Sequence, residues 1–158
     1  MGIKARGRTR KLTKNYRNTK EILTAAWTIL ESTPEEPDVE ATFPKVKPEA
    51  ALRSGKLPCL QICDSSEQEV KGAIEIIQSL QKEGYNSQDI AIAYRSKGKK
   101  DQELFSQLIN QLKQVGIETY WVTKTDQEKE NYNTQKSGVR ILTSLSCLGL
   151  EFPVIILL

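Results

Sequence analysis

The chain has 158 residues, of which 38% are hydrophobic and 27% charged, which is ordinary for one globular domain that buries about 70% of its unfolded surface. No stretch approaches the ~20 apolar residues of a membrane span and no signal-peptide pattern is present, so we expect a cytoplasmic protein with no membrane partner. Because histidine is absent, Ser-His-Asp and Cys-His catalysis are excluded, and Cys59, Cys63 and Cys147 lack further zinc ligands. We expect no metal site and three buried thiols.

The net charge of +3 hides an asymmetry at the amino end. The first twenty residues contain no acid and eight bases, which are Lys4, Arg6, Arg8, Arg10, Lys11, Lys14, Arg17 and Lys20. A solvated terminus explains this run, and so does a binding surface for the phosphates of a nucleotide or nucleic acid. Composition leaves both interpretations open.

The first third of the chain predicts a strand, a helix and a long connection. The strand is expected within Arg8–Tyr16, around Leu12, and Asn18 is the expected N-cap of the helix, with Glu21 three positions later. The apolar stripe of this helix is Ile22, Leu23, Ala26, Trp27 and Leu30. From Thr33 to Pro58 no periodicity remains, so residues 31–58 are predicted to be an irregular connection and the remnant of an inserted domain.

The remaining sequence alternates strands and helices. Strands are expected around Leu60–Ile62 and at Ile90–Tyr94, Ile117–Val122, Val139–Thr143 and Pro153–Leu158. One helix begins at Ser65-Ser66 and ends at Gly84, the next runs from Asp101 to Gly116, and Thr123–Ser137 is expected to be a loop. This alternation predicts an α/β fold with a largely parallel sheet and right-handed crossovers. The chain stops on the apolar run Ile156-Leu157-Leu158, so we expect a piece of a longer protein.

Two polar clusters interrupt these elements. Asn15-Tyr16-Arg17-Asn18-Thr19 lies where a strand gives way to a helix, and it offers a flat ring for stacking beside a guanidinium for phosphate. Taken alone, it fits a capped helix start with a surface arginine better than it fits a nucleotide site. Gly149 and Glu151 lie between the last two strands, both expected to be central, where open α/β folds bind ligands at the carboxyl ends.

Together the two clusters resemble motifs of the UvrD/Rep-type superfamily 1 DNA helicases. Leu12-x-x-Asn15-Tyr16-Arg17-Asn18-Thr19-x-x-Ile22-Leu23 resembles motif IV, and Thr143–Leu157, with Gly-Leu-Glu-Phe, resembles motif V. Ile90–Ser96 is similar to the strand that these helicases place between the two motifs. The three matches stand in the family's order and are spread over nearly the whole chain.

The resemblance implies that residues 1–158 are the C-terminal RecA-like domain of an ATP-dependent DNA helicase or translocase, truncated before motif VI. Its mostly parallel sheet would carry helices on both faces, as in the P-loop NTPases, without the P-loop itself. ATP and Mg²⁺ would be bound mainly by the N-terminal RecA-like domain of the same parent chain. Single-stranded or partly duplex DNA would be the other partner.

The same resemblance assigns roles to individual residues. Tyr16 would stack on adenine, Glu151 would contact the ribose, and Gly149 would let the backbone approach closely. Arg17 would be the catalytic arginine finger, a group worth about a thousandfold or more in rate. Arg95, Lys97 and Thr143 would contact single-stranded DNA, with Lys99 and Lys100 adding charge.

Departures from the family pattern support an alternative. Leu145 and Leu148 stand where motif V commonly has histidine and lysine. These positions favour a non-catalytic RecA-like scaffold or nucleic-acid-binding domain that has lost motor activity, while an unrelated doubly wound domain is a third interpretation. The chain contains neither GxxxxGK[ST] nor a strand ending in paired acids, and motif VI is absent, so we expect no ATP hydrolysis by this chain alone.

Overall fold

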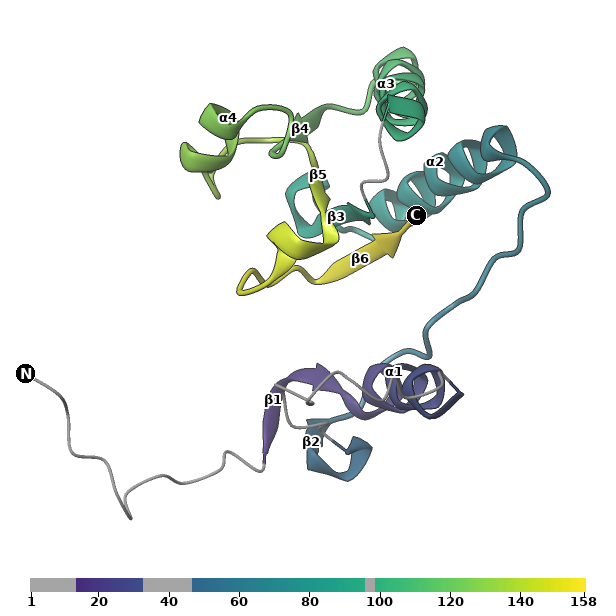
Figure 1. The fold of residues 1–158 in the computed structure, drawn as a ribbon, viewed down its shortest axis with the longest axis vertical. Coiled ribbons are helices and arrows are strands. Elements are labelled where there is room, and N and C mark those ends of the chain that lie inside the picture. The colour runs from purple at the N-terminus through teal and green to yellow at the C-terminus, as the bar shows by residue number, and fades with distance from the viewer. Residues whose placement is uncertain (1–13, 33–46, 96–98) are drawn as a thin grey trace, which may run out of the picture. The chain divides into compact units, whose positions relative to one another are not determined.

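The computed structural model describes residues 14–32, 47–95 and 99–158. The chain divides into two compact units, Met1–Leu60 and Gln61–Leu158, which we call the first and the second unit and describe separately (Figure 1).

The first unit contains a pair of parallel strands and one long helix. Strand β1 (Asn15–Thr19) leads directly into α1 (Lys20–Ser32), and a short 3-10 helix η1 (Pro48–Ala50) precedes β2 (Ala51–Arg53). Asn15 pairs with Ala51 and Thr19 with Arg53, with a shift of register between them. Most of the predicted first strand, including Leu12, lies outside the described residues, and the strand that is described begins at Asn15.

The predicted N-cap of the first helix was wrong by one residue. Asn18 belongs to β1, and its N–H donates to the side chain of Asn15. Thr19 Oγ1 instead accepts a hydrogen bond from the N–H of Ile22 at 3.4 Å. The helix therefore begins at Lys20, with Thr19 as its N-cap.

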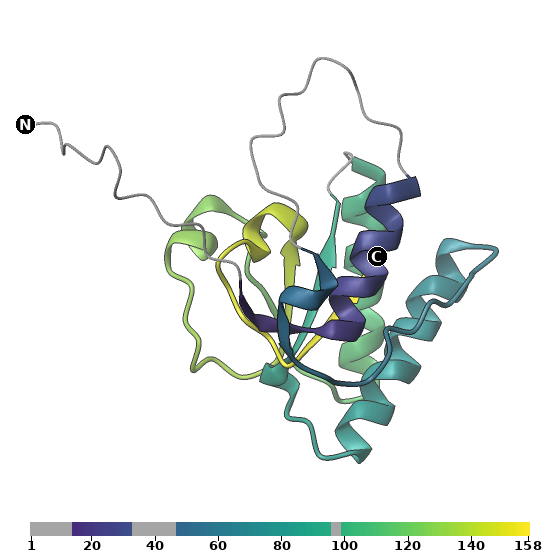
Figure 2. The same cartoon turned by 90° about the horizontal axis from the view of Figure 1, so that it is seen from below.

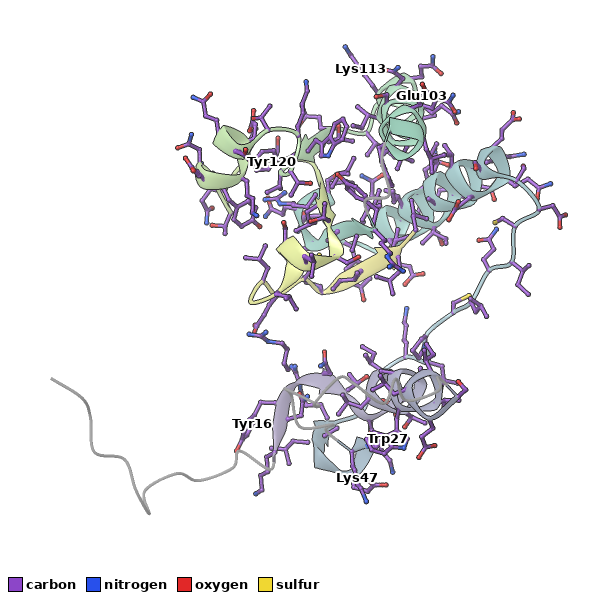
Figure 3. The ribbon with its side chains drawn as sticks, viewed as in Figure 1. Tyr16, Trp27, Lys47, Glu103, Lys113 and Tyr120 are labelled. Carbon is purple, nitrogen blue, oxygen red and sulfur yellow. The ribbon has the colours of Figure 1, made fainter. Side chains whose placement is uncertain are left out.

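The predicted apolar stripe of α1 is largely uncovered in the structure. Leu23 is the buried residue of this helix, whereas Ile22, Ala26 and Leu30 are exposed. The indole N–H of Trp27, labelled in Figure 3, donates to the carboxylate of Glu31 on the same helix. The helical periodicity predicted the helix correctly but not the extent of its burial.

Two predictions between residues 31 and 64 need correction. Residues 33–46 lie outside the described part, but 51–53 form β2 and so are not an irregular connection. The strand predicted around Leu60 and Ile62 is absent, since residues 54–64 have no helix or strand and both side chains are 87% exposed. Two apolar residues around Gln61 imitate the period of a strand, but no neighbouring strand pairs with this segment in the described residues.

The second unit is built on a four-stranded parallel sheet in the order β4-β5-β3-β6. Its strands are β3 (Ile90–Tyr94), β4 (Thr119–Trp121), β5 (Val139–Thr143) and β6 (Val154–Leu157). Its helices are α2 (Ser66–Lys82), α3 (Lys99–Gln114) and α4 (Asp126–Glu130), with 3-10 helices η2 (Ser87–Asp89) and η3 (Ser144–Cys147). A short helix, α4, therefore lies inside the segment that was predicted to be a loop.

The two long helices cover one face of this sheet. Residues of α2 and α3 share one apolar core with alternate residues of β3 and β5; its largest fully buried members include Ile77, Ile90, Ile92, Leu108, Leu112 and Ile141. Figure 2 shows α2 and α3 on the same side of the strands. The opposite face carries a smaller cluster around Ala91, Tyr120 and Leu142, covered by Tyr132, Cys147, Leu150 and Phe152 from the segments of α4 and η3. The sheet is thus covered on both faces, as predicted for an α/β RecA-like domain.

The caps of α2 confirm the sequence analysis. Ser65 Oγ accepts a hydrogen bond from the N–H of Gln68 at 3.2 Å, and Gly84 follows the helix with a φ of 99°. A positive φ suits glycine because it has no Cβ to clash with the backbone. The long helix and its flanking turns were therefore predictable from local chemistry.

The last strand differs from its prediction as a strand buried on both faces. β6 pairs with β3 alone and forms one edge of the described sheet. Ile156 is buried, but Ile155 and Leu157 are exposed. Successive side chains of a strand point to opposite faces, so Ile156 packs into the core shared with α2 and α3, while Ile155 and Leu157 lie on the other face and are exposed. No helix in the described part of the chain is long and apolar enough to cross a membrane.

Candidate nucleotide and nucleic-acid site

Tyr16 and Arg17 lie on a turn that is held by a side chain. Asn15 Oδ1 accepts hydrogen bonds from the N–H groups of both Arg17 and Asn18, each at 2.9 Å. This turn coincides with the register shift in β1, so the regular alternation of strand side chains is interrupted here. Tyr16 is 65% exposed and projects from β1 (Figure 3), and Arg17 is also exposed. Adjacent residues of β1 thus supply an exposed aromatic ring and an exposed guanidinium.

A groove of about 450 Å³ follows this turn within the first unit. It is lined by Lys20, Glu21, Thr24, Ala25, Ser54, Leu57 and Pro58. The first turn of α1 supplies one wall and residues 54–58 supply the other. The groove combines apolar surface with one cation, Lys20, and one carboxylate, Glu21. These two residues follow Thr19 directly in the chain.

Arg95 and Thr143 lie together at the carboxyl ends of neighbouring strands. Tyr94, the last residue of β3, is in register with Thr143, the last residue of β5, and Arg95 follows Tyr94. Thr143 Oγ1 caps η3, because it accepts a hydrogen bond from the N–H of Ser146 at 3.3 Å. Arg95 is exposed, and Lys97 lies outside the described residues. The edge that was predicted to contact DNA therefore presents one cation beside a hydroxyl that is engaged in capping.

Gly149 and Glu151 do not share this edge directly. β6 runs parallel to β3, and its first residue, Val154, is in register with Ile90 at the amino end of β3. The segment after η3 must therefore return across the sheet, and Glu151 lies on this return path instead of directly at the carboxyl ends. Gly149 has a φ of 89°, which glycine tolerates, and Glu151 is exposed.

The predicted nucleotide-binding residues fall into different units. Tyr16 and Arg17 belong to the first unit, and Gly149 and Glu151 belong to the second. That these four residues bind one nucleotide together stays a prediction.

The two leucines that depart from the family pattern are fully presented to solvent. Leu145, within η3, is 80% exposed, and Leu148, the C-cap of η3, is 78% exposed. Their side chains do not contribute to either core of the second unit. Whatever their role, it is not packing within this unit.

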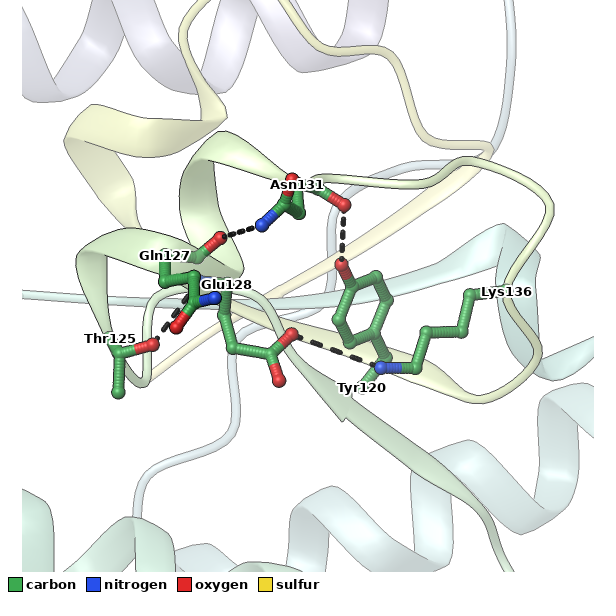
Figure 4. A network of polar contacts seen from close by, with 6 residues as sticks. All are labelled: Tyr120, Thr125, Gln127, Glu128, Asn131 and Lys136. Atoms are coloured by element: carbon green, nitrogen blue, oxygen red, sulfur yellow. Dashed lines mark hydrogen bonds and ion pairs between the residues drawn. The ribbon is translucent and has the colours of Figure 1, made fainter.

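A polar and aromatic network beside β4 and β5 was not anticipated from the sequence (Figure 4). The Tyr120 hydroxyl donates to the carbonyl of Asn131 at 3.5 Å, and the ammonium of Lys136 lies 3.9 Å from the centre of the Tyr120 ring. The same ammonium lies 3.9 Å from a carboxylate oxygen of Glu128. These contacts tie α4 and the segment after it to the sheet.

Arg140 anchors the same segment from within the sheet. Its side chain is 1% exposed, and its guanidinium donates to the carbonyls of Gly138 at 2.5 Å and Thr134 at 2.8 Å. Its Nε has no hydrogen-bond partner among the residues that the structure describes. A single arginine inside the apolar run from Val139 to Leu142 was the sequence signal for this role.

The three cysteines differ in their surroundings. Cys59 is exposed, while Cys63 and Cys147 are half-buried, so the prediction of three buried thiols was wrong for Cys59. Burial raises the pKa of the Cys147 thiol above its usual value. Among the described residues, no three or more His, Cys, Asp and Glu side chains gather where they could hold a metal ion.

The comparison with known families gives a match over most of the chain. The family of the UvrD-like helicase C-terminal domain matches residues 10–129. This range includes the pentapeptide Asn15–Thr19 and β3, and it ends before the segment that resembles motif V. No curated protein and no solved structure matches the chain significantly.

Proposed function

This chain belongs to the UvrD-like helicase C-terminal domain family, and we propose that it is the second motor domain of an ATP-dependent DNA helicase. In this proposal it completes the ATP site of an N-terminal motor domain and contacts single-stranded DNA. The observation that carries the proposal is the exposed Tyr16–Arg17 pair on the turn fixed by Asn15, inside the matched range. An aromatic face beside a guanidinium fits the base and the phosphates of a nucleotide.

The residues of the first unit fit one side of ATP. Tyr16 offers its ring to adenine, and Arg17 offers its guanidinium to the γ-phosphate. ATP with Mg²⁺ supplies the phosphoryl group, and a guanidinium placed against its developing negative charge stabilises the transition state. From the second unit, Glu151 contacts the ribose, and Gly149 permits the backbone to approach the nucleotide closely. The N-terminal motor domain of the parent chain holds Mg²⁺ and most of the nucleotide.

Arg95 and Thr143 form the DNA-facing part of the proposal, together with Lys97. Their two strand ends are adjacent in the sheet, so one strand of DNA can contact both. In this proposal, the cleft between this domain and the N-terminal motor domain opens and closes during hydrolysis. This movement carries the two motor domains along the DNA strand. Because this chain has no phosphate-binding GxxxxGK[ST] loop, we expect it to be inactive as an ATPase by itself.

Replacement of Arg17 tests the ATP side of the proposal. In the complete helicase, Arg17→Ala is expected to lower the DNA-stimulated ATPase kcat about a thousandfold. ATP binding should change little, because the finger acts mainly on charge that develops in the transition state. Lys47→Ala removes another exposed cation of the first unit and serves as the control (Figure 3). An unchanged rate in Arg17→Ala removes the assignment.

A second pair of variants tests the DNA side. Arg95→Ala should weaken single-strand binding and reduce the slope of log affinity against log salt by about one. Lys113, an exposed cation in the last turn of α3, is the matched control (Figure 3). If the Arg95→Ala and Lys113→Ala variants bind single-stranded DNA equally well, Arg95 is an exposed residue at a strand end that does not contact DNA.

The alternative function is a RecA-like scaffold that has lost motor activity. The exposure of Leu145 and Leu148 favours it, since these side chains offer no charge or hydrogen bond to DNA. The two proposals separate in one assay, because a scaffold leaves DNA binding measurable while the complete protein shows no DNA-stimulated ATP hydrolysis. A DNA-stimulated rate that depends on Arg17 decides for the motor.

A further inference from the structure

The last residue of β2, Arg53, makes a direct contact with the backbone of Arg17. Arg53 Nη2 donates a hydrogen bond to the carbonyl oxygen of Arg17 at 2.7 Å. The two residues lie on paired parallel strands, where Arg53 is in register with Thr19. A charged donor at this distance makes a strong hydrogen bond to a carbonyl. This contact fixes the peptide group that follows Arg17.

A second contact reaches the first turn of α1, which follows β1 directly. The N–H of Gly55 donates to Glu21 Oε2 at 2.7 Å, on the first turn of α1. Hydrogen bonds from the backbone of Glu21 itself and of Gly55 lower the pKa of this carboxyl. The carboxylate is therefore ionised at neutral pH and stays a strong acceptor.

Gly55 also packs against the turn without space for a side chain. A Cβ placed on Gly55 meets Thr19 Cγ2 at 2.7 Å, closer than real Cβ atoms approach. Thr19 is β-branched and caps α1, so its methyl group cannot easily move away. The crossing segment thus needs glycine here for its close approach.

These contacts hold a stretch that lacks a regular strand ladder. Between Asn15 and Thr19 the pairing with β2 shifts in register, so side chains must fix the backbone there. Asn15 binds the N–H groups of Arg17 and Asn18 from inside the turn, and Arg53 binds the Arg17 carbonyl from across it. Both polar groups of the Arg17 backbone are thereby engaged by side chains.

We propose that Arg53, Gly55 and Glu21 form a brace that orients Arg17 toward the transferred phosphate, with Arg53 as a positioning residue. The brace rests on the function proposed above for Arg17. It acts because a guanidinium must be held to within a fraction of an ångström to stabilise a transition state, and a misplacement of about 1 Å can cost a hundredfold in rate. Arg53 itself does not touch the nucleotide in this proposal.

Substitution of Arg53 in the complete helicase tests the positioning role. Arg53→Ala is expected to lower kcat about tenfold to a hundredfold with little change in the Kd of ATP. Arg53→Lys should recover part of kcat, because one ammonium can donate to the one carbonyl of Arg17. A loss of ATP affinity instead of kcat overturns the proposal, since it makes Arg53 a direct ligand of the nucleotide.

A size-compensating pair tests the same brace without removing a charge. Gly55→Ala should lower kcat as Arg53→Ala does, because its Cβ displaces the segment from Thr19. Thr19→Ser removes Cγ2 and keeps the hydroxyl that caps α1, so the double variant Gly55→Ala/Thr19→Ser should recover most of the activity. Equal kcat values for Gly55→Ala and the unmodified protein contradict the close approach.

Amide hydrogen exchange in the 158-residue chain separates failure of the brace from failure of the function. Exchange at Arg17 and Asn18 should accelerate in Arg53→Ala and in Gly55→Ala. If Arg17→Ala leaves ATP hydrolysis unchanged, the proposed function fails, and the exchange rates still show whether the brace exists. If Arg17→Ala abolishes hydrolysis but Arg53→Ala keeps full kcat, the positioning role is refuted, whatever the exchange rates are.

Discussion

The side-chain oxygen of Asn15 accepts a hydrogen bond from the backbone N–H of Arg17 at 2.9 Å. The same oxygen accepts from the N–H of Asn18, so one amide group closes the turn on which Tyr16 and Arg17 stand. Asparagine is favoured at such positions because its short side chain reaches backbone N–H groups two and three residues ahead. The first asparagine of the pentapeptide therefore sets the conformation that presents the ring and the guanidinium.

Asn15→Ala is expected to loosen this turn without unfolding the protein. The variant loses two hydrogen bonds, each worth about 1 kcal/mol, so the free energy of local opening should fall by about 1–2 kcal/mol. Amide exchange at Arg17 and Asn18 measures this change. Asn15→Asp keeps the acceptor and should retain most of the protection, and equal exchange in all three proteins contradicts the turn.

Arg140→Ala is expected to be among the most destabilising single changes in the second unit. It leaves the buried carbonyl of Gly138 and the carbonyl of Thr134 without their donor and removes a fully buried side chain, at a cost of about 2–4 kcal/mol. Urea unfolding measures the loss. Lys136→Ala, which removes a half-exposed contact to Glu128 and Tyr120, should cost less than about 1 kcal/mol. Similar losses in both variants refute an anchoring role for Arg140.

The contact between Glu21 and Gly55 should depend on pH in acid. The folded protein lowers the pKa of Glu21 below its usual 4.5, so the ionised form stabilises the fold above that value. The stabilisation is lost as pH falls from 4.5 through the lower pKa of the folded state. Protection of the Gly55 amide should decrease over this range, whereas Glu21→Gln should show no such transition. If the protection of the Gly55 amide in the unmodified chain does not change over this pH range, the contact with Glu21 is contradicted.

The cysteines should react in an order set by exposure and pKa. Cys59 is exposed, whereas Cys147 is half-buried and its raised pKa leaves less thiolate at neutral pH. A maleimide or disulfide reagent should therefore modify Cys59 before Cys147, with peptide mapping as the readout. Faster reaction of Cys147 contradicts its burial in the structure.

The well-packed second unit follows closely from its sequence. Ser65 and Gly84 predicted the ends of α2 through local capping, and the apolar run Ile90–Tyr94 predicted a strand covered on both faces. These elements agree with the tertiary structure because their local preference and their burial point the same way. The family resemblance, drawn from the pentapeptide, Ile90–Ser96 and Thr143–Leu157 together, was confirmed by the family match over residues 10–129.

The features that the sequence did not predict are those that depend on contacts between residues far apart in the chain. No local pattern predicts that Arg53 and Gly55 return to β1 and α1, since their partners lie more than thirty residues earlier in the chain. Alternation at Leu60 and Ile62 predicted a strand that has no partner in the described residues. Only the parallel register of Val154 with Ile90 puts Glu151 on a return path across the sheet. Spacing along the sequence does not contain that information.

Photolabelling of the complete helicase with an ATP analogue that carries an azido group on adenine tests the central claim most directly. Our account predicts that peptide mapping finds the label on Tyr16, and that excess ATP and Tyr16→Ala both remove it. Label that is absent from the peptide containing Tyr16, at saturating analogue, contradicts the account.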